Sequence, residues 1–172
     1  MRLNSGLDLT IASLNCRGLR NNLKRAAIFD KCKTFDIIAL QETHITDNVV
    51  EHWKKLWAGE FFYSEGNSRS KGQILLVRKH LTSTNSDICI KTERILGINI
   101  TIDGKKYTTV NIYGPDRRSD RKQFIDELIA TLDTVHPTNV IVCGDFNMVL
   151  DNTLDIISGD LHNKEDVDAF NK

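Results

Sequence analysis

The 172-residue sequence has only two prolines, and its four cysteines, Cys16, Cys32, Cys89 and Cys143, are scattered. So little proline, together with 40% hydrophobic residues, excludes a string of linkers and favours one globular domain over residues 1–172. The cysteines form no Cys-x-x-Cys pair. We therefore expect free, buried thiols in a reducing compartment, ahead of zinc sites or disulfides.

Long apolar runs are absent too, and no stretch has the pattern of a signal peptide. We therefore expect an intracellular, soluble protein with no membrane partner. The formal net charge is zero, but residues 151–172 carry six acidic residues against two lysines, which leaves 17 acidic and 21 basic residues in 1–150. Residues 1–150 are therefore mildly basic and residues 151–172 are acidic.

What the sequence does contain is a series of short apolar segments spaced as strands and helices. Strands are predicted at residues 7–14, 35–40, 73–77, 88–90, 94–102, 106–113 and 139–143, and helices at 22–33, 47–57 and 119–132. Asp103-Gly104 is typical of a hairpin turn. Because hairpins are mixed with β-α-β crossovers, we expect an α/β fold in which helices flank the sheets.

In the first predicted helix, the apolar residues define a face that we expect to be buried. These residues are Leu23, Ala26, Ala27 and Ile28, whereas Lys24 and Arg25 are expected on the solvent side.

Several predicted strands end in polar residues. The run at 139–143 stops at Gly-Asp-Phe-Asn, where Asp145 and Asn147 are two residues apart and can converge on one ligand. An aspartate can take a proton or hold a metal, whereas an asparagine only makes hydrogen bonds. Asn15, Glu42 and Tyr113 follow or end three other strands. Four such endings indicate one site at one edge of stacked sheets, although Asp145 and Asn147 alone also fit a simple turn.

Four ordered motifs carry a resemblance to a known family. They are Leu-Asn-Cys-Arg-Gly at 14–18, Leu-Gln-Glu-Thr-His at 40–44, Asn-Ile-Tyr-Gly-Pro at 111–115 and Gly-Asp-Phe-Asn at 144–147. In this order they resemble the DNase I-like endonuclease/exonuclease/phosphatase superfamily. Their wording, with the Ser-Lys-Gly loop at 70–72, is most similar to the apurinic-type endonuclease domain of non-LTR (LINE-type) retrotransposon polyproteins.

The resemblance implies a fold, a cofactor and partners. The fold would be a four-layer α/β sandwich with two mixed β-sheets flanked by helices. The activity would be Mg²⁺-dependent (or Mn²⁺-dependent) cleavage of a phosphodiester bond in DNA, nicking the target for retrotransposition. The protein would be a monomer linked to a downstream reverse-transcriptase domain, and nuclear if it acts on chromosomal DNA.

The family's site residues map onto this sequence one by one. Glu42 would bind the metal, with Asn15 hydrogen-bonding in the metal shell. Asp145 would orient or deprotonate the attacking water, Asn147 would hold the phosphate or the water, and the Tyr113 hydroxyl would lie near the phosphate. The alternatives are that Tyr113 is a core ring and that Asn15 belongs to a simple turn.

Basic residues near these motifs are predicted to contact the DNA backbone. They are Arg17, Arg20, Arg69, Lys71, Arg117 and Arg118, and the alternative is that they are ordinary solvated charges. His44 is predicted to be an exposed loop residue that touches DNA and takes no catalytic part.

One family feature has no match here. Members end in a Ser-Asp-His or similar tripeptide on a final strand, and the nearest string, Ser-Gly-Asp-Leu-His at 158–162, follows Gly-Asp-Phe-Asn too closely. We therefore expect a domain that is incomplete at the C-terminus and lacks the C-terminal strands. The alternatives to an endonuclease are an inactive fragment that retains metal or DNA binding, and a phosphatase or phosphodiesterase of the same superfamily.

Overall fold

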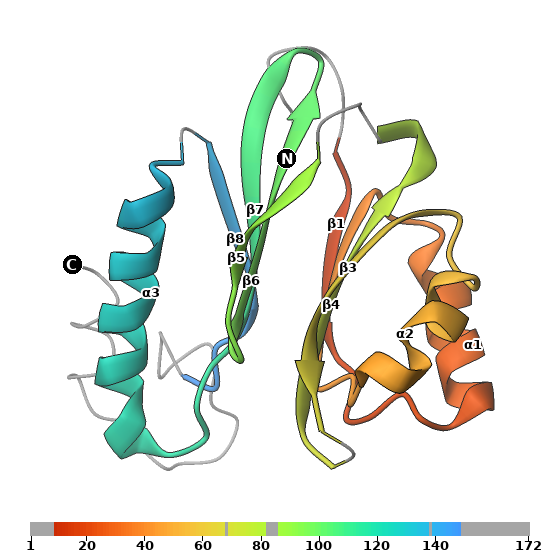
Figure 1. Cartoon of the computed structure of the whole chain (residues 1–172), viewed down its shortest axis with the longest axis horizontal. Helices are drawn as coiled ribbons and strands as arrows, with labels where there is room; N and C mark the ends of the chain where they lie inside the picture. The colour runs from red at the N-terminus through yellow and green to blue at the C-terminus, as the bar shows by residue number, and fades with distance from the viewer. Residues whose placement is uncertain (1–8, 68, 82–85, 138, 149–172) are drawn as a thin grey trace, which may run out of the picture. The chain divides into compact units, whose positions relative to one another are not determined.

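The computed structural model describes residues 9–67, 69–81, 86–137 and 139–148. The fold divides into two compact units, one of Met1–Tyr113 with Pro137–Asp145 and the other of Gly114–His136 with Phe146–Lys172. The first unit contains two four-stranded sheets (Figure 1).

The first sheet has the strand order β1-β2-β4-β3. Its strands are β1 (Ile11–Asn15), β2 (Ile37–Gln41), β3 (Gly59–Gly66) and β4 (Lys71–Arg78). β1 and β2 are parallel, and their last residues, Asn15 and Gln41, are register partners. β4 runs antiparallel to both β2 and β3, so the sheet is mixed.

The second sheet has the order β5-β6-β7-β8. Its strands are β5 (Asp87–Lys91), β6 (Ile95–Ile102), β7 (Lys105–Tyr113) and β8 (Val140–Asp145). The predicted hairpin turn joins β6 to β7, and its two residues, Asp103 and Gly104, have φ of 49° and 74°. Two positive φ values match the twist of the flanking strands. β7 and β8 are parallel, with Tyr113 opposite Asp145, so this sheet is mixed as well.

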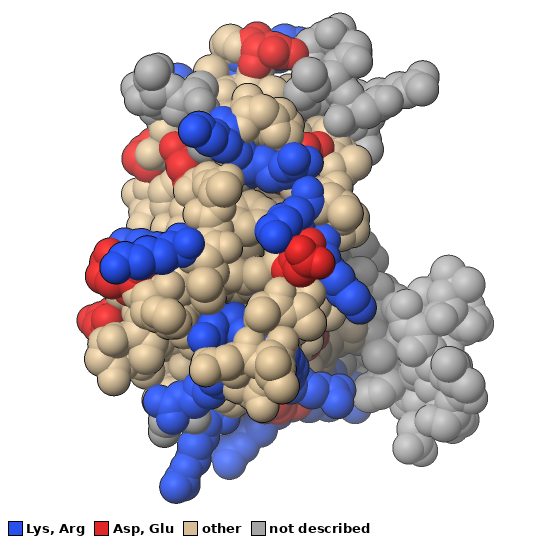
Figure 2. Space-filling model, turned by 90° about the vertical axis from the view of Figure 1, so that its right-hand side faces the viewer, with Lys and Arg blue, Asp and Glu red and all other residues tan. Residues whose placement is uncertain are grey.

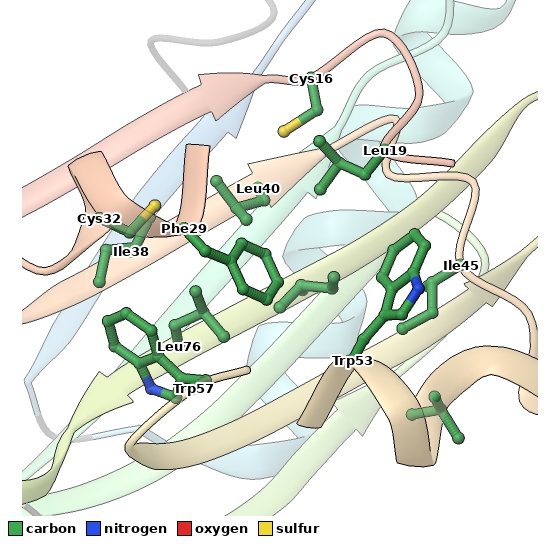
Figure 3. Packing of buried hydrophobic residues seen from close by; sticks show 12 residues of the cluster. Cys16, Leu19, Phe29, Cys32, Ile38, Leu40, Ile45, Trp53, Trp57 and Leu76 are labelled. Atoms are coloured by element: carbon green, nitrogen blue, oxygen red, sulfur yellow. The ribbon is translucent and has the colours of Figure 1, made fainter. Parts of the chain in front are cut away.

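Two apolar clusters account for the core. One cluster contains residues of both sheets, among them Ala39 and Leu75 from the first and Leu96 and Ile98 from the second, all fully buried. The sheets therefore pack face to face. The other cluster lies where α1 (Asn22–Cys32) and α2 (Asp47–Lys54) cover the first sheet, as Figure 3 shows. The expected α/β class with two mixed sheets and flanking helices is confirmed.

The buried face of α1 differs from the prediction. Leu23 is 83% exposed, whereas Arg25 is 4% exposed and faces the core with Phe29 and Cys32. The Arg25 guanidinium lies 4.8 Å from the centre of the Trp53 ring and donates to the backbone oxygen of Leu19 at 3.0 Å. An aromatic face and carbonyl acceptors can solvate a buried guanidinium. Burial also lowers the pKa of Arg25 from its ordinary value.

The sequence pattern also missed β3. This strand contains Phe61, Phe62 and Tyr63 in succession, none of which is fully buried, so no alternation marks it. Aromatic residues are enriched in strands, and that composition was the available signal.

The described part of the second unit is mainly helical. The predicted third helix is confirmed as α3 (Arg121–Val135), which follows the 3₁₀ turn η2 (Arg118–Asp120) and buries Phe124, Ile125 and Leu128. A second 3₁₀ turn, η1 (Lys79–Leu81), belongs to the first unit. Among the described residues, no helix has the length and apolarity needed to cross a membrane.

All four thiols are free, as predicted. Cys16 and Cys32 are buried, and Cys89 and Cys143 are half-buried. Burial raises the pKa of Cys16 from 9.0 to about 12 and those of Cys32 and Cys143 to about 11, because a thiolate loses its hydration there.

Candidate active site

The carboxyl ends of two parallel strand pairs lie in the same unit and carry the predicted residues. β1 ends at Asn15 beside the end of β2, where Glu42 follows, and β7 ends at Tyr113 opposite Asp145 at the end of β8. One pair belongs to each sheet. The strand ends therefore place these side chains together in the first unit.

Asn15 connects the two sheets at this edge. Its side-chain Nδ2 donates to Glu42 Oε1 and to Asp145 Oδ2, both at 2.7 Å. Its Oδ1 accepts from the backbone N–H of Arg17 at 3.0 Å, which fixes the orientation of the amide. Charge-assisted hydrogen bonds of this length are strong, so Asn15 holds the two carboxylates toward one point.

The loop that carries Glu42 is held between the loop after β1 and the first residues of β4. The Glu42 backbone oxygen accepts from Gly18 N at 2.6 Å, and Thr43 N donates to Gly72 O at 2.9 Å. Glu42 itself has φ of 49°, a left-handed conformation that is uncommon outside glycine. Such a conformation persists only when its surroundings fix it, and here the bonds to Gly18 and Gly72 do so from both sides.

Tyr113 and Asn147 are placed differently. Tyr113 is only 7% exposed, so most of its ring is core, the alternative that the sequence left open. Asn147 belongs to the second unit, where its Nδ2 donates to Gly114 O at 2.9 Å and to Asp116 Oδ1 at 3.0 Å. The structure thus brings Asn15, Glu42 and Asp145 together, and a shared site with Asn147 stays a prediction.

A buried amide pair below this edge was not predicted. Gln41 Nε2 donates to Asn111 Oδ1 at 2.7 Å, which joins β2 of one sheet to β7 of the other. Asn111 Nδ2 donates in turn to the backbone oxygens of Leu40, at 3.0 Å, and Ile74, at 3.3 Å. Both amides are fully buried, and they stand one and two residues before Glu42 and Tyr113. The available signal was a polar residue where the strand pattern requires an apolar one.

Four of the six predicted DNA-contacting residues lie on loops at the same edge. Arg17 and Arg20 are exposed on the loop after β1, Arg69 is exposed on the β3–β4 connection, and Lys71 begins β4. Figure 2, which views the α1–α2 side, shows Lys and Arg side chains gathered at its lower end, where Figure 1 places both loops. Lys71 pairs with Glu93 in the structure.

The other two, Arg117 and Arg118, are exposed residues of the second unit.

His44 is not the exposed residue that the sequence predicted. Its ring is half-buried, and its Nδ1 would lie 2.9 Å from a Cβ added to Gly18, so the ring packs against that glycine. Burial is the largest effect on its pKa, which is lowered because the charged ring would lose hydration, and Arg20 and Lys24 lower it further. Glu42 opposes this shift, but the net lowering of the pKa favours the neutral ring, which packs against Gly18.

The donor set fits a hydrated Mg²⁺ ion. Mg²⁺ is typically bound through one or two carboxylates, waters and substrate phosphates. Because Glu42 Oε1 and Asp145 Oδ2 each lie 2.7 Å from one nitrogen, the two oxygens are separated by no more than twice that distance. Within the described residues, no group of three or more His, Cys, Asp or Glu is placed to hold a metal. Two carboxylates, which Asn15 holds by hydrogen bonds, suit Mg²⁺ better than a closed zinc site.

The string at 158–162, considered above as a substitute for the family's last motif, lies outside the described residues.

Comparisons with known proteins place this site in a family. Residues 12–154 match the Endonuclease/Exonuclease/phosphatase family, and the chain belongs to that family. A curated relative, the uncharacterized 149 kDa protein of transposon TX1 from Xenopus laevis, is 27% identical over 149 residues, which cover 84% of this chain. The chain spans only 11% of that relative's length.

Solved structures share the fold. An AP endonuclease from Archaeoglobus fulgidus matches with a TM-score of 0.69 and 18% identity, over 95% of this chain and 69% of that one. The endonuclease domain of TRAS1, a telomere-specific non-LTR retrotransposon, matches with a TM-score of 0.59 and 16% identity, over 81% of this chain and 59% of that one. D. rerio TDP2 complexed with a single-strand DNA product matches with a TM-score of 0.59 and 24% identity, over 84% of this chain and 62% of that one.

Proposed function

We propose that this chain is a Mg²⁺-dependent DNA endonuclease domain of a retrotransposon polyprotein. The observation that carries the proposal is the pair of carboxylates, Glu42 and Asp145, which Asn15 holds together at the common edge of two sheets. The transposon relative and the nuclease neighbours support DNA as the substrate, and the Arg and Lys residues on the adjacent loops supply the charge that phosphates require.

The proposed chemistry is hydrolysis of one phosphodiester bond. A water oxygen forms the new P–O bond while one bridging P–O bond breaks, and the leaving sugar oxygen takes a proton from solvent water. Asp145 accepts the proton of that water, and Tyr113 donates a hydrogen bond to a phosphate oxygen as negative charge develops. Mg²⁺, held by Glu42, would supply additional stabilisation of that charge. Asn15 keeps both carboxylates in place throughout.

The test is nicking of supercoiled plasmid. We expect conversion to the open circular form with Mg²⁺ or Mn²⁺ and none with EDTA. Isothermal titration with Mg²⁺ should show one site, weakened in Glu42→Gln. If the wild-type chain binds neither Mg²⁺ nor DNA, the proposal is wrong. Binding of both without nicking would identify an inactive fragment instead.

Arg69 and Lys71 should contribute to DNA affinity through phosphate contacts. Replacing both with alanine removes two cations from the β3–β4 connection. If both contact phosphates, the slope of log K against log salt should become shallower by about two, since each contact releases roughly one counterion. Fluorescence anisotropy of a labelled duplex at several salt concentrations measures this slope.

The matched control is the double replacement of Lys105 and Lys106, which are exposed at the start of β7, at the opposite end of that strand from Tyr113. An unchanged slope in the Arg69 and Lys71 variant, or an equal change in the control, would reject a specific role for the β3–β4 connection.

A further inference from the structure

Arg94 contacts Tyr113 in three ways. Its guanidinium carbon lies 5.5 Å from the centre of the Tyr113 ring, and its Nη1 donates to the Tyr113 backbone oxygen at 3.1 Å. The Tyr113 N–H donates to the Arg94 backbone oxygen at 2.9 Å. One residue thus contacts both the ring and the main chain of the tyrosine.

The turn that carries Arg94 is built without its side chain. Thr92 N donates to Ile95 O at 2.8 Å, and Thr92 Oγ1 accepts from the backbone N–H groups of Arg94, at 3.2 Å, and Ile95, at 3.0 Å. The Thr92 backbone oxygen also accepts from the Ser64 hydroxyl of β3. Shortening the Arg94 side chain therefore leaves every one of these bonds in place.

We propose that Arg94 is a positioning residue that fixes the Tyr113 ring, and with it the hydroxyl, at the end of β7. The proposal rests on the function proposed above, because only a DNA substrate supplies the phosphate to which the Tyr113 hydroxyl would donate a hydrogen bond. A planar guanidinium can lie over an aromatic face while its N–H groups donate hydrogen bonds in the guanidinium plane. The tyrosine hydroxyl has to reach hydrogen-bond distance of a phosphate oxygen, and its position has to be held to a few tenths of an ångström.

Three substitutions separate the contributions. Arg94→Lys keeps a cation near the ring but loses the planar donor, Arg94→Gln keeps a donor for the Tyr113 oxygen but loses the charge, and Arg94→Ala loses both. We expect the nicking kcat to fall about threefold to thirtyfold in Arg94→Ala, the range typical of a cation on an aromatic ring, with KM nearly unchanged. Lysine should restore part of the loss.

A double-mutant cycle with Tyr113→Phe distinguishes positioning from general support of the fold. Once the hydroxyl is absent, Arg94→Ala should cost no further activity. An equal loss of kcat in the wild-type and Tyr113→Phe backgrounds would overturn the proposal.

A spectroscopic measurement makes the outcome independent of nicking. The chain has three tyrosines, whose rings can be labelled with ¹³C and observed by NMR. The signals that are missing from the spectrum of Tyr113→Phe are then assigned to Tyr113. In Arg94→Ala these signals should shift or broaden, while those of Tyr63, which has its own cation, Lys91, at 4.6 Å, should not. Unchanged Tyr113 signals would refute the positioning role. Shifted signals in a protein that never nicks would support it and reject the proposed function alone.

Discussion

Replacing Asp145 with asparagine should lower Mg²⁺-dependent nicking by about a hundredfold to ten-thousandfold, the usual contribution of a positioned general base. The amide keeps the size of the side chain and can still accept from Asn15 Nδ2, so the fold is expected to survive. It cannot take a proton from water, and it removes one of the two charges that face the metal. Initial rates of plasmid nicking, with Mg²⁺ affinity measured by titration, check this result.

The matched control is Asp103→Asn. Asp103 is exposed in the β6–β7 turn, at the opposite end of β7 from Tyr113. Its substitution should leave both nicking and Mg²⁺ affinity unchanged. Full activity in Asp145→Asn would show that another group takes the proton, and the assignment of Asp145 as the base would be withdrawn.

Asn111→Leu should have the largest effect on stability. The change removes a fully buried amide that accepts from Gln41 Nε2 and donates to two backbone oxygens. Gln41 Nε2 keeps Ala39 O and Ser13 Oγ as acceptors, so the loss falls mainly on the backbone oxygens of Leu40 and Ile74. At about 1–3 kcal/mol for each buried polar group that loses its partner, a loss of roughly 2–5 kcal/mol in the free energy of unfolding is expected. Urea denaturation followed by tryptophan fluorescence measures the loss.

The double variant Gln41→Leu/Asn111→Leu tests the pairing itself. If the two amides stabilise each other, the double variant should be destabilised by less than the sum of the two single changes, because removing both leaves fewer orphaned groups. Gln123→Leu, the same type of change at an exposed position of α3, should be nearly neutral. If the two losses in the free energy of unfolding were strictly additive, the hydrogen bond between Gln41 and Asn111 would contribute nothing to stability.

The sequence predicted the fold class and most strands because local patterns determine them. Runs of β-branched and apolar residues mark β6 and β7, which are largely buried, and polar residues mark the strand ends at Asn15 and Asp145, which the structure brings together. β3 was not predicted because its run of aromatic residues shows no alternation of apolar and polar side chains. The predicted buried face of α1 was wrong because Arg25 is buried against the Trp53 ring of α2. The spacing of residues within α1 gives no information on a contact with another helix.

The positioning contacts could not be predicted for the same reason. The bond between Gln41 and Asn111 joins residues 70 positions apart on different sheets, and the contact of Arg94 with Tyr113 depends on how β6 pairs with β7. Such contacts depend on register and on the packing of one sheet against the other, neither of which a strand pattern specifies.

The raised pKa values of the cysteines have a practical consequence. Maleimides and other thiol reagents attack the thiolate, and burial keeps Cys16, Cys32 and Cys143 protonated at neutral pH and raises the pKa of the half-buried Cys89 as well. A cysteine introduced at exposed Lys105 would carry an ordinary surface thiol. A fluorophore or spin label would therefore attach there selectively, with all four native cysteines left in the chain, and report on DNA binding from the end of β7 remote from Tyr113.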